Sequence, residues 1–325
     1  MPELVTATEI AAAADRIAGV AVRTPLVSFP GRPLLIKPES LQPTGSFKLR
    51  GAYSVISALG EEARSRGVIA HSSGNHAGAV GYAAARLGVR AVLVIPANAP
   101  EVKLAKARAT GAEIVTVDPG LDARIAATDE LIARHGYTFV PPFDHSGTIA
   151  GQGTIGLEIL ADSRDVDLVV VPVSGGGLIS GVAAAVKAAR PDVKVVGVEP
   201  ELAADARDSL RAGRRVAWTS RQTQRTIADA LRLEQVGELT FEHIRRLVDD
   251  IVTVTEEEIR VAVRRLALEG RLIAEPGGAV AVAACLLRER ELPPASAPVA
   301  VLSGGNVDPA LLTAVLTGTA ADPAA

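Results

Sequence analysis

Lys48 is the side chain of this sequence best suited to covalent chemistry. It lies in the segment PTGSFKLRGA (residues 43–52), between a turn and a helix predicted over residues 47–59. A lysine amine that is removed from water loses its proton more easily and can then attack a carbonyl carbon. Taken alone, the segment also fits an exposed lysine in the first turn of an ordinary helix. The other segments of the chain decide between these interpretations.

The polar segment SSGNH (residues 72–76) follows a strand predicted over residues 68–71 and leads into a helix predicted over residues 76–87. Backbone N–H groups at the start of a helix have no partner within the helix and attract an anion, such as a substrate carboxylate. Ser and Asn are also the usual capping residues, so a cluster of N-caps is the alternative. Five polar or glycine residues in a row exceed what one cap requires.

The glycine segment SGGG (residues 174–177) lies between a strand predicted over residues 168–173 and a helix predicted over residues 178–189. Glycines at such a junction let the backbone wrap closely around a ligand, and their N–H groups at the positive end of the helix suit a phosphate. No Gly-Lys-Ser/Thr follows, so this is not a Walker loop. A flexible connector is the alternative, but three ordered glycines cost more backbone entropy than a plain turn.

A second glycine motif, GQGTIG (residues 151–156), fits the dinucleotide fingerprint G-x-G-x-x-G in its letters only. That fingerprint requires a strand, a turn and a helix in this order, and residues 144–148 do not form a strand pattern. We therefore predict the start of a helix here and not a nicotinamide site.

Two more predicted strand ends carry polar side chains. Ser303, in the segment SGGN (residues 303–306), could exchange one hydrogen bond with a heteroaromatic nitrogen. Glu199 follows a strand predicted over residues 194–198, and Asp205 comes six residues later. Two carboxylates could hold a hard divalent cation, although their spacing alone favours two solvated acids.

One cofactor, pyridoxal phosphate, together with an amino-acid substrate, would use the lysine, the glycine segment, the serine and the polar segment at once. Its aldehyde suits a desolvated lysine, its phosphate suits the glycine segment, and its pyridine nitrogen suits the serine. The polar segment at residues 72–76 remains for the carboxylate of an amino-acid substrate.

The composition argues against several other functions. The net charge is −3 without a basic block, so nucleic acid is not an expected partner. The single cysteine, Cys285, excludes a disulfide within the chain and a cysteine-based metal site. The N-terminal segment has charges on a helical pattern and is not a signal peptide, and no apolar run approaches the roughly 18 residues of a membrane span. We expect a soluble, cytoplasmic protein without a membrane partner.

Short apolar runs alternate with amphipathic stretches along the chain, which is typical of buried parallel sheets covered by helices. The predicted strands span residues 34–37, 68–71, 91–95, 114–117, 168–173, 194–198, 251–254 and 298–302. The predicted helices span residues 47–59, 76–87, 101–109, 121–135, 152–160, 178–189, 256–268 and 278–290. We predict an α/β fold with its ligands at the carboxyl ends of the strands. The segment PPFDHSG (residues 141–147) is the predicted crossing between two domains.

The chain resembles the fold-type II pyridoxal-phosphate enzymes, in particular the serine/threonine dehydratases (threonine ammonia-lyases), serine racemases and hydroxyaspartate dehydratases. The resemblance covers about residues 24–306 and rests on the segments GSFKLRGA, HSSGNH, SGGGL, VEP and LSGGNV in this order. It implies a tryptophan synthase β-like fold of two α/β domains, with parallel or mixed sheets and the cofactor between them. Residues 1–66 and 145–325 would form the large cofactor-binding domain and residues 67–144 a small inserted domain. No C-terminal regulatory domain is expected.

The resemblance also implies a role for each matching residue. Lys48 is expected to form the Schiff base and to act as the base at Cα, with Ser73 as the acid/base on the opposite ring face. The expected cofactor contacts are Phe47 on the ring, Asn75 at the 3-oxygen, Ser303 at the pyridine nitrogen, and Ser174, Gly175, Gly176, Gly177 and Leu178 around the phosphate. The substrate carboxylate is expected among Ser72, Ser73 and His76. Glu199, the carbonyl of Ala203 and Asp205 match the family's site for a divalent cation, which is Mg²⁺ or in its place Ca²⁺ or Mn²⁺.

These roles predict a lyase that eliminates water from a β-hydroxy amino acid, such as L-threonine or L-serine, and releases a 2-keto acid and ammonia. Racemisation of serine or aspartate and dehydration of hydroxyaspartate are the alternatives. β-Replacement is disfavoured, because Leu49-Arg50 follows Lys48 where those enzymes usually have Asp-Arg. A non-catalytic binding protein could lose Lys48 or Ser73, and both are present. The resemblance further implies a homodimer.

Two positions depart from the family pattern. Ala230 stands where the loop Ile-Ala-Asp-Gly usually has its glycine, so a methyl is added near the substrate and a positive φ would be disfavoured. Ser174 replaces the first glycine of the phosphate loop, and its hydroxyl can still donate to a phosphate. Ala230 therefore leaves the choice among β-hydroxy amino acids open.

Overall fold

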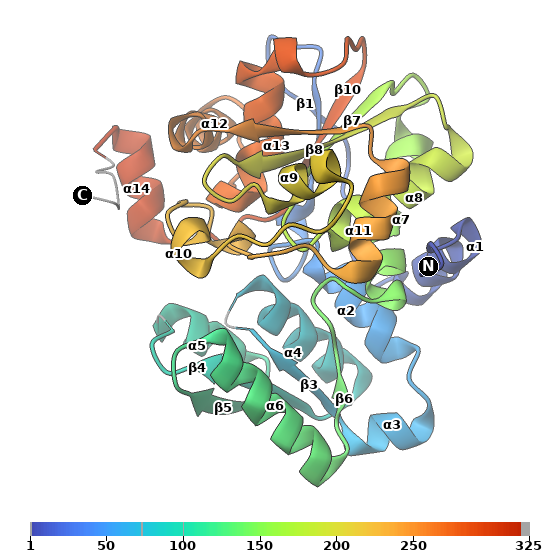
Figure 1. Cartoon of the computed structure of the whole chain (residues 1–325), viewed down its shortest axis with the longest axis vertical. Helices are drawn as coiled ribbons and strands as arrows, with labels where there is room; N and C mark the ends of the chain where they lie inside the picture. Colours follow the sequence, from blue (N-terminus) through green and yellow to red (C-terminus); the bar gives the residue numbers. More distant parts are fainter. Residues whose placement is uncertain (1, 73, 100, 320–325) are drawn as a thin grey trace.

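The computed structural model describes residues 2–72, 74–99 and 101–319, with only the backbone described at residues 101–103 and 106. It contains two β-sheets, which lie one above the other in Figure 1. We call the six-stranded one the large sheet and the four-stranded one the small sheet. The predicted α/β class with a tryptophan synthase β-like arrangement is confirmed.

The large sheet is almost entirely parallel. Its strands, in spatial order, are β1 (Val27–Ser28), β2 (Leu35–Pro38), β10 (Pro298–Leu302), β7 (Leu168–Pro172), β8 (Lys194–Pro200) and β9 (Asp250–Val254). Only the β1–β2 pair is antiparallel among these described pairs. Every residue of β7 is buried, as expected for a central parallel strand that is covered on both faces.

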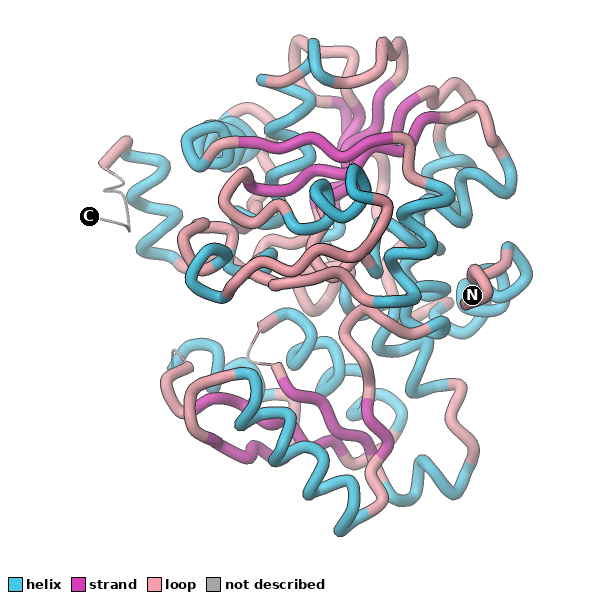
Figure 2. The backbone as a smooth tube through the Cα atoms, in the orientation of Figure 1, coloured by secondary structure: helices cyan, strands magenta, loops and turns pink. Residues whose placement is uncertain are grey.

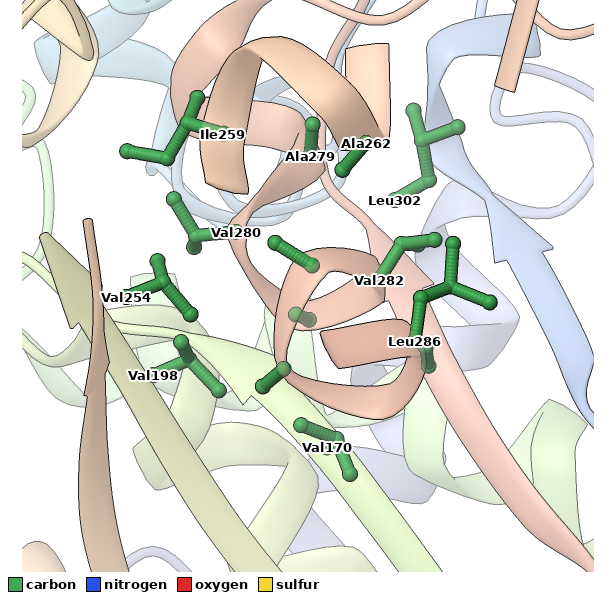
Figure 3. Packing of buried hydrophobic residues seen from close by; sticks show 14 of the residues in the cluster. Val170, Val198, Val254, Ile259, Ala262, Ala279, Val280, Val282, Leu286 and Leu302 are labelled. Carbon is green, nitrogen blue, oxygen red and sulfur yellow. The ribbon is translucent and has the colours of Figure 1, made fainter. Parts of the chain in front are cut away.

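Helices cover both faces of the large sheet. The helices α12 (Glu256–Leu268) and α13 (Pro276–Leu287) pack on one face, where Figure 3 shows Val170 and Val198 directed at α13. The helices α7 (Ser146–Asp162), α8 (Gly177–Ala189) and α11 (Glu238–Leu247) cover the other face, with Val169 and Val171. Successive side chains of a strand point to opposite faces, so neighbouring valines supply both cores.

The small sheet is fully parallel, with the spatial order β5 (Glu113–Val117), β4 (Ala91–Pro96), β3 (Val68–His71) and β6 (Thr138–Phe139). The helices α2 (Lys48–Ser57), α4 (Asn75–Leu87) and α5 (Glu101–Ala109) share a core on one face, and α6 (Leu121–His135) packs on the other. Figure 2 shows α2 where the two parts meet, and α2 contacts both α4 and α7. The helix that begins with Lys48 therefore bridges the two sheets.

The remaining helices lie at the periphery. They are α1 (Ala7–Ile17), α3 (Glu61–Arg66), α9 (Asp205–Ala212), α10 (Ser220–Thr223) and α14 (Pro309–Thr317). Within the described ranges, no helix is both long and apolar enough to span a membrane.

The structure agrees closely with the predicted elements. All eight predicted strands are present with ends within two residues of the prediction, and each predicted helix is present. The two-residue strands β1 and β6 are too short to leave a sequence pattern. The segment 141–147 runs from β6 of the small sheet into α7, which packs on α8. The domain boundaries at residues 66/67 and 144/145 stay predictions, although β3 to β6 all fall between them.

One helix start is wrong in the prediction. The helix α7 begins at Ser146 instead of residue 152, so the motif GQGTIG lies inside the helix and not at its start. Its glycines allow neighbouring helices to approach: a Cβ on Gly153 would lie 3.0 Å from the carbonyl oxygen of Gly181 in α8. This close packing explains the motif without a dinucleotide.

Three buried charged side chains, Lys37, Glu39 and Arg50, meet the partly buried Glu158 where β2, α2 and α7 come together. Arg50 donates to both oxygens of Glu39 at 2.7 and 2.8 Å, and to both oxygens of Glu158 at 2.6 and 2.9 Å. Lys37 donates to Glu158 at 2.6 Å and to the carbonyl of Thr24. Burial works against the charge of Glu39, but Arg50 outweighs it and lowers the pKa of this carboxyl. This buried ion network anchors the first turn of α2.

Candidate active site

The turn before α2 and the turn after β10 are joined by backbone hydrogen bonds. The amide of Phe47 donates to the carbonyl of Ser303 at 3.0 Å, and the amide of Gly305 donates to the carbonyl of Gly45 at 2.9 Å. Gly45 has a φ of +73°, which a residue with a side chain rarely adopts. The structure thus brings together Lys48 and Ser303, the two residues expected at opposite ends of the cofactor ring.

The amine of Lys48 lies in a partly buried position that favours its neutral form. Its Nζ donates to the carbonyl oxygen of Pro142 at 2.7 Å and lies 5.1 Å from the centroid of the Phe47 ring. Burial lowers the pKa of Lys48 to about 8, and the negative charge of Glu275 partly opposes this shift. A substantial share of the free amine is therefore available at pH 7–8, as the attack on a carbonyl requires.

The polar segment after β3 starts the helix α4. Asn75 is its first residue, and the next residue, His76, is only 4% exposed with Nε2 2.8 Å from the carbonyl oxygen of Val140. Burial, with a contribution from the charge of Lys48, lowers the pKa of His76 to about 3. The imidazole is therefore neutral, and its Nε2 is already engaged. A contact of His76 with a substrate carboxylate would require the other ring nitrogen.

The two serines of this segment differ in what the structure describes. The hydroxyl of Ser72 accepts a hydrogen bond from the amide of Gly74 at 3.2 Å, which turns the chain into α4. Ser73, the expected acid/base, lies outside the described residues.

The glycine segment lies where β7 leads into α8. Gly176 is the N-cap of α8 with a φ of +87°, and none of the described side chains caps this helix end. A Cβ on Gly175 would lie 2.4 Å from the ring of Phe143, so a side chain does not fit there. The hydroxyl of Thr240 donates to the carbonyl of Gly175 at 2.7 Å, so this carbonyl already has a hydrogen-bond partner. The backbone N–H groups at the helix start are thus left to suit a phosphate.

Asn75 has two hydrogen-bond partners, Glu275 and Asn306, whose contacts with it the sequence does not predict. Its Nδ2 donates to Glu275 at 2.6 Å, and its Oδ1 accepts from Asn306 at 2.8 Å. These partners lie 200 and 231 residues away in the chain, so spacing carries no signal for either contact. The only local signal for Glu275 is its place as N-cap of α13, directly before Pro276.

A pair of buried carboxylates lies at the end of β8. Glu199 accepts hydrogen bonds from the amides of Ala206 at 3.1 Å and Arg207 at 2.8 Å, at the start of α9. Asp205 is 1% exposed, and neither of its oxygens has a hydrogen-bond partner of good geometry among the described residues, although its own amide and that of Val236 lie close enough to favour its charge.

Burial raises the pKa of both carboxyls of this pair. Burial and the nearby Asp205 raise the pKa of Glu199, and burial raises the pKa of Asp205 to about 7. Together with the buried Ala203, these residues fit a hard cation that would compensate their charge. The described residues contain no group of three His, Cys, Asp or Glu side chains close enough to hold a metal, so a cation here would need the backbone carbonyl.

Ala230 does not adopt the positive φ that its side chain would disfavour. This residue lies in a short 3₁₀-helix (Asp229–Leu231), and among the described residues with a side chain only Arg271 has a positive φ. The methyl of Ala230 lies 3.3 Å from the position that a Cβ on Gly277 would occupy. The missing side chain at residue 277 therefore provides room for this methyl.

These residues fit pyridoxal phosphate in three respects. They provide an amine with a lowered pKa, a glycine-lined helix start without a side-chain cap, and a serine turn fixed next to that amine. All three come after strands or at helix starts, where parallel sheets present their ligand-binding residues.

Comparisons with known proteins point to one family. Residues 17–304 match the family described as pyridoxal-phosphate dependent enzyme. The chain is 45% identical to an L-threonine ammonia-lyase of Thermotoga maritima over 279 residues, which cover 86% of this chain and 68% of that protein. It is 40% identical to an L-threo-3-hydroxyaspartate ammonia-lyase of Saccharomyces cerevisiae, over 89% of this chain and 87% of that protein. The solved structure of maize serine racemase superimposes with a TM-score of 0.90 at 36% identity and covers 97% of this chain and 98% of that chain.

Proposed function

Because this chain belongs to the pyridoxal-phosphate dependent enzymes of the threonine dehydratase and serine racemase family, we propose that it is an ammonia-lyase for a β-hydroxy amino acid. L-Threonine or L-serine would lose water and give a 2-keto acid and ammonia. The observation that carries this proposal is the partly buried amine of Lys48, held 2.7 Å from the carbonyl oxygen of Pro142 beside the Ser303 turn. The similarity to a threonine ammonia-lyase over 86% of the chain supports the same activity.

The proposed chemistry assigns a task to each group of the site. Bound pyridoxal phosphate supplies a sink for the electrons that remain when a Cα proton leaves. The free amine of Lys48 takes that proton, and its pKa of about 8 suits a base that works near neutral pH. The hydroxyl of Ser303 is neutral and does not keep a pyridine nitrogen protonated as a carboxylate would, which favours prompt departure of the β-hydroxyl. The N-terminus of α8 would hold the phosphate.

Racemisation is the second candidate, since the maize serine racemase structure covers 97% of this chain with a TM-score of 0.90. It needs a proton donor opposite Lys48, a role we assign to Ser73. We further propose a divalent cation at Glu199, Asp205 and the carbonyl of Ala203. A homodimer and a cytoplasmic location stay predictions.

The test measures release of 2-keto acid from the purified holoenzyme. The panel contains L- and D-serine, both threonine diastereomers and 3-hydroxyaspartate, each with and without Mg²⁺. Lys48→Ala is expected to abolish release, whereas Lys194→Ala, at an exposed lysine paired with Asp249, should retain it. Full activity of Lys48→Ala would refute the mechanism.

The panel also separates the two candidate functions. Chiral analysis of the remaining serine measures racemisation in the same samples. If serine is racemised without keto-acid release, the racemase is the correct function. Ser73→Ala should suppress racemisation far more strongly than elimination from an L-substrate.

A further inference from the structure

The amide group of Asn75 is held in one orientation. Asn306 uses its Nδ2 twice, donating to the carbonyl of Thr44 at 2.9 Å and to Oδ1 of Asn75 at 2.8 Å. At the other end, Nδ2 of Asn75 donates to Oε1 of Glu275 at 2.6 Å. A carbonyl and an ionised carboxylate only accept hydrogen bonds. Reversing the Asn75 amide would therefore place oxygen against oxygen at Glu275 and nitrogen against nitrogen at Asn306.

Glu275 is built into the turn that follows β10. Glu275 is only 5% exposed, and its backbone amide donates to the carbonyl of Gly304 at 3.1 Å. A Cβ on Gly304 would lie 2.5 Å from Oε1 of Glu275, so the carboxylate packs directly on this turn. A buried carboxylate is costly unless neighbouring donors and charges compensate it. Its position is therefore fixed from the backbone side as well as by Asn75.

The same contact connects the two sheets. Asn75 begins α4, which follows β3 of the small sheet, whereas Glu275 is the N-cap of α13, which packs on β10 and β7 of the large sheet. The short bond between them thus crosses from one sheet to the other, directly beside the turns that carry Lys48 and Ser303.

We propose that Glu275 is a positioning residue: it fixes the amide of Asn75 so that the second N–H faces the cofactor's 3-oxygen, and it places a negative charge beside Lys48. This inference rests on the proposed function, because the 3-oxygen contact is expected from the cofactor role of Asn75. The effect of Glu275 on Lys48 is electrostatic, since an anion stabilises the protonated amine. In the described part of the chain, His76 is a second titratable group that interacts with Lys48; it is neutral and supplies no compensating charge.

The first measurement uses the apo-protein and needs no substrate. A small amine-reactive reagent labels Lys48 as a function of pH, and peptide mapping reads the labelled fraction. Glu275→Gln, which keeps the size of the side chain and removes its charge, should shift the labelling curve of Lys48 to lower pH. Asp167→Asn is the matched control: it removes a carboxylate that accepts the amides of Ser296 and Ala297 before β10, and should leave the curve unchanged.

The second measurement follows cofactor binding by its absorbance. Glu275→Gln should weaken binding about tenfold, as expected for the loss of a charge-assisted hydrogen bond. Asn75→Asp places two carboxylates face to face and should lower the midpoint of thermal unfolding. Adding Glu275→Gln to Asn75→Asp restores a donor to that pair, so the midpoint should recover while cofactor binding stays weak.

These measurements distinguish a failure of the positioning role of Glu275 from a failure of the proposed function. If Glu275→Gln leaves both the labelling curve and the cofactor affinity as in the wild type, the positioning role is wrong. The same holds if the double variant does not recover the thermal midpoint lost in Asn75→Asp. If instead the wild type releases no keto acid and racemises no serine, the proposed function fails while the labelling curves still test the link between Glu275 and Lys48.

Discussion

The Nζ atom of Lys48 lies 2.7 Å from the carbonyl oxygen of Pro142, 94 residues further along the chain. Lys48 starts α2, which bridges the two sheets, and Pro142 lies in the segment that returns from the small sheet to α7. The reactive amine is thus held where the chain leaves the large sheet and where it comes back. A protonated amine donates to this carbonyl, and a neutral one is ready to react.

The reactivity of Lys48 should rise with pH through its pKa of about 8. Burial favours the neutral amine, so below pH 8 each pH unit should lower the free-amine fraction about tenfold, and above pH 8 it should level off. Stopped-flow absorbance of cofactor binding to the apo-protein, from pH 6 to 9, measures this. Nα-acetyl-lysine gives the reference curve. Its reactivity should level off at a pH about two units higher than that of Lys48, because its amine has an ordinary pKa. Superimposable curves would contradict a partly buried amine.

The turn beside Ser303 should not tolerate a methyl at Gly278. A Cβ there would lie 2.2 Å from the carbonyl oxygen of Gly304, so Gly278→Ala should cost about 1–3 kcal/mol in the free energy of unfolding and weaken cofactor binding. Gly78→Ala is the control, because a Cβ at this position in α4 meets nothing within 4 Å, and it should stabilise by up to about 1 kcal/mol. Urea unfolding followed by circular dichroism compares them. Equal stabilities of the two variants would show that the turn can shift.

A divalent cation should stabilise the protein through its buried carboxylate pair. Mg²⁺ or Ca²⁺ would compensate the charges of Glu199 and Asp205, so the midpoint of thermal unfolding should rise by at least about 2 °C. Asp205→Asn should abolish this response. Asp208→Asn is the control, since Asp208 lies in the same helix but accepts a hydrogen bond from Trp218 Nε1. A response that survives Asp205→Asn would place the cation elsewhere.

The methyl of Ala230 should affect the choice of substrate and have little effect on the stability of the protein. Ala230→Gly removes a methyl that fills the room beside Gly277, so stability should change by less than about 1 kcal/mol. We expect the ratio of kcat/KM values to shift about tenfold toward substrates with a larger β-substituent. One methyl group in a pocket typically changes the discrimination between two substrates by about this factor. Keto-acid release from threonine and serine, compared as a ratio, measures the change. An unaltered ratio would place Ala230 away from the substrate.

The sequence predicts the elements well because they are long and strongly patterned. The buried strand β7 follows from a short continuous apolar run, and the helix over residues 121–135 follows from apolar periodicity. The start of α7 is missed because Ser146 and the residues after it lack that periodicity: ten of the 17 residues of α7 are buried, on several sides of the helix. A helix that is covered all round carries no amphipathic signal.

The site residues that the sequence predicts are likewise those with a local pattern. Lys48, Ser303 and the glycine segment carry local signals, because each needs a particular turn or helix start. The contacts of Glu275 and Asn306 with Asn75 carry no local signal, since they join residues 200 and 231 positions apart. The backbone conformation at Ala230 has no local signal either, because the conformation of its loop depends on α13 packed against it.

The buried ion network around Arg50 has a consequence for behaviour on heating. Arg50, Glu39 and Lys37 are fully buried, and the penalty for keeping such charges out of water falls as temperature rises. The hydration that charges give up on folding is entropically unfavourable, so the network contributes relatively more to the folded state when the protein is warm. The first turn of α2, and with it the position of the Lys48 amine, should consequently be among the last parts of the molecule to loosen as it approaches thermal unfolding.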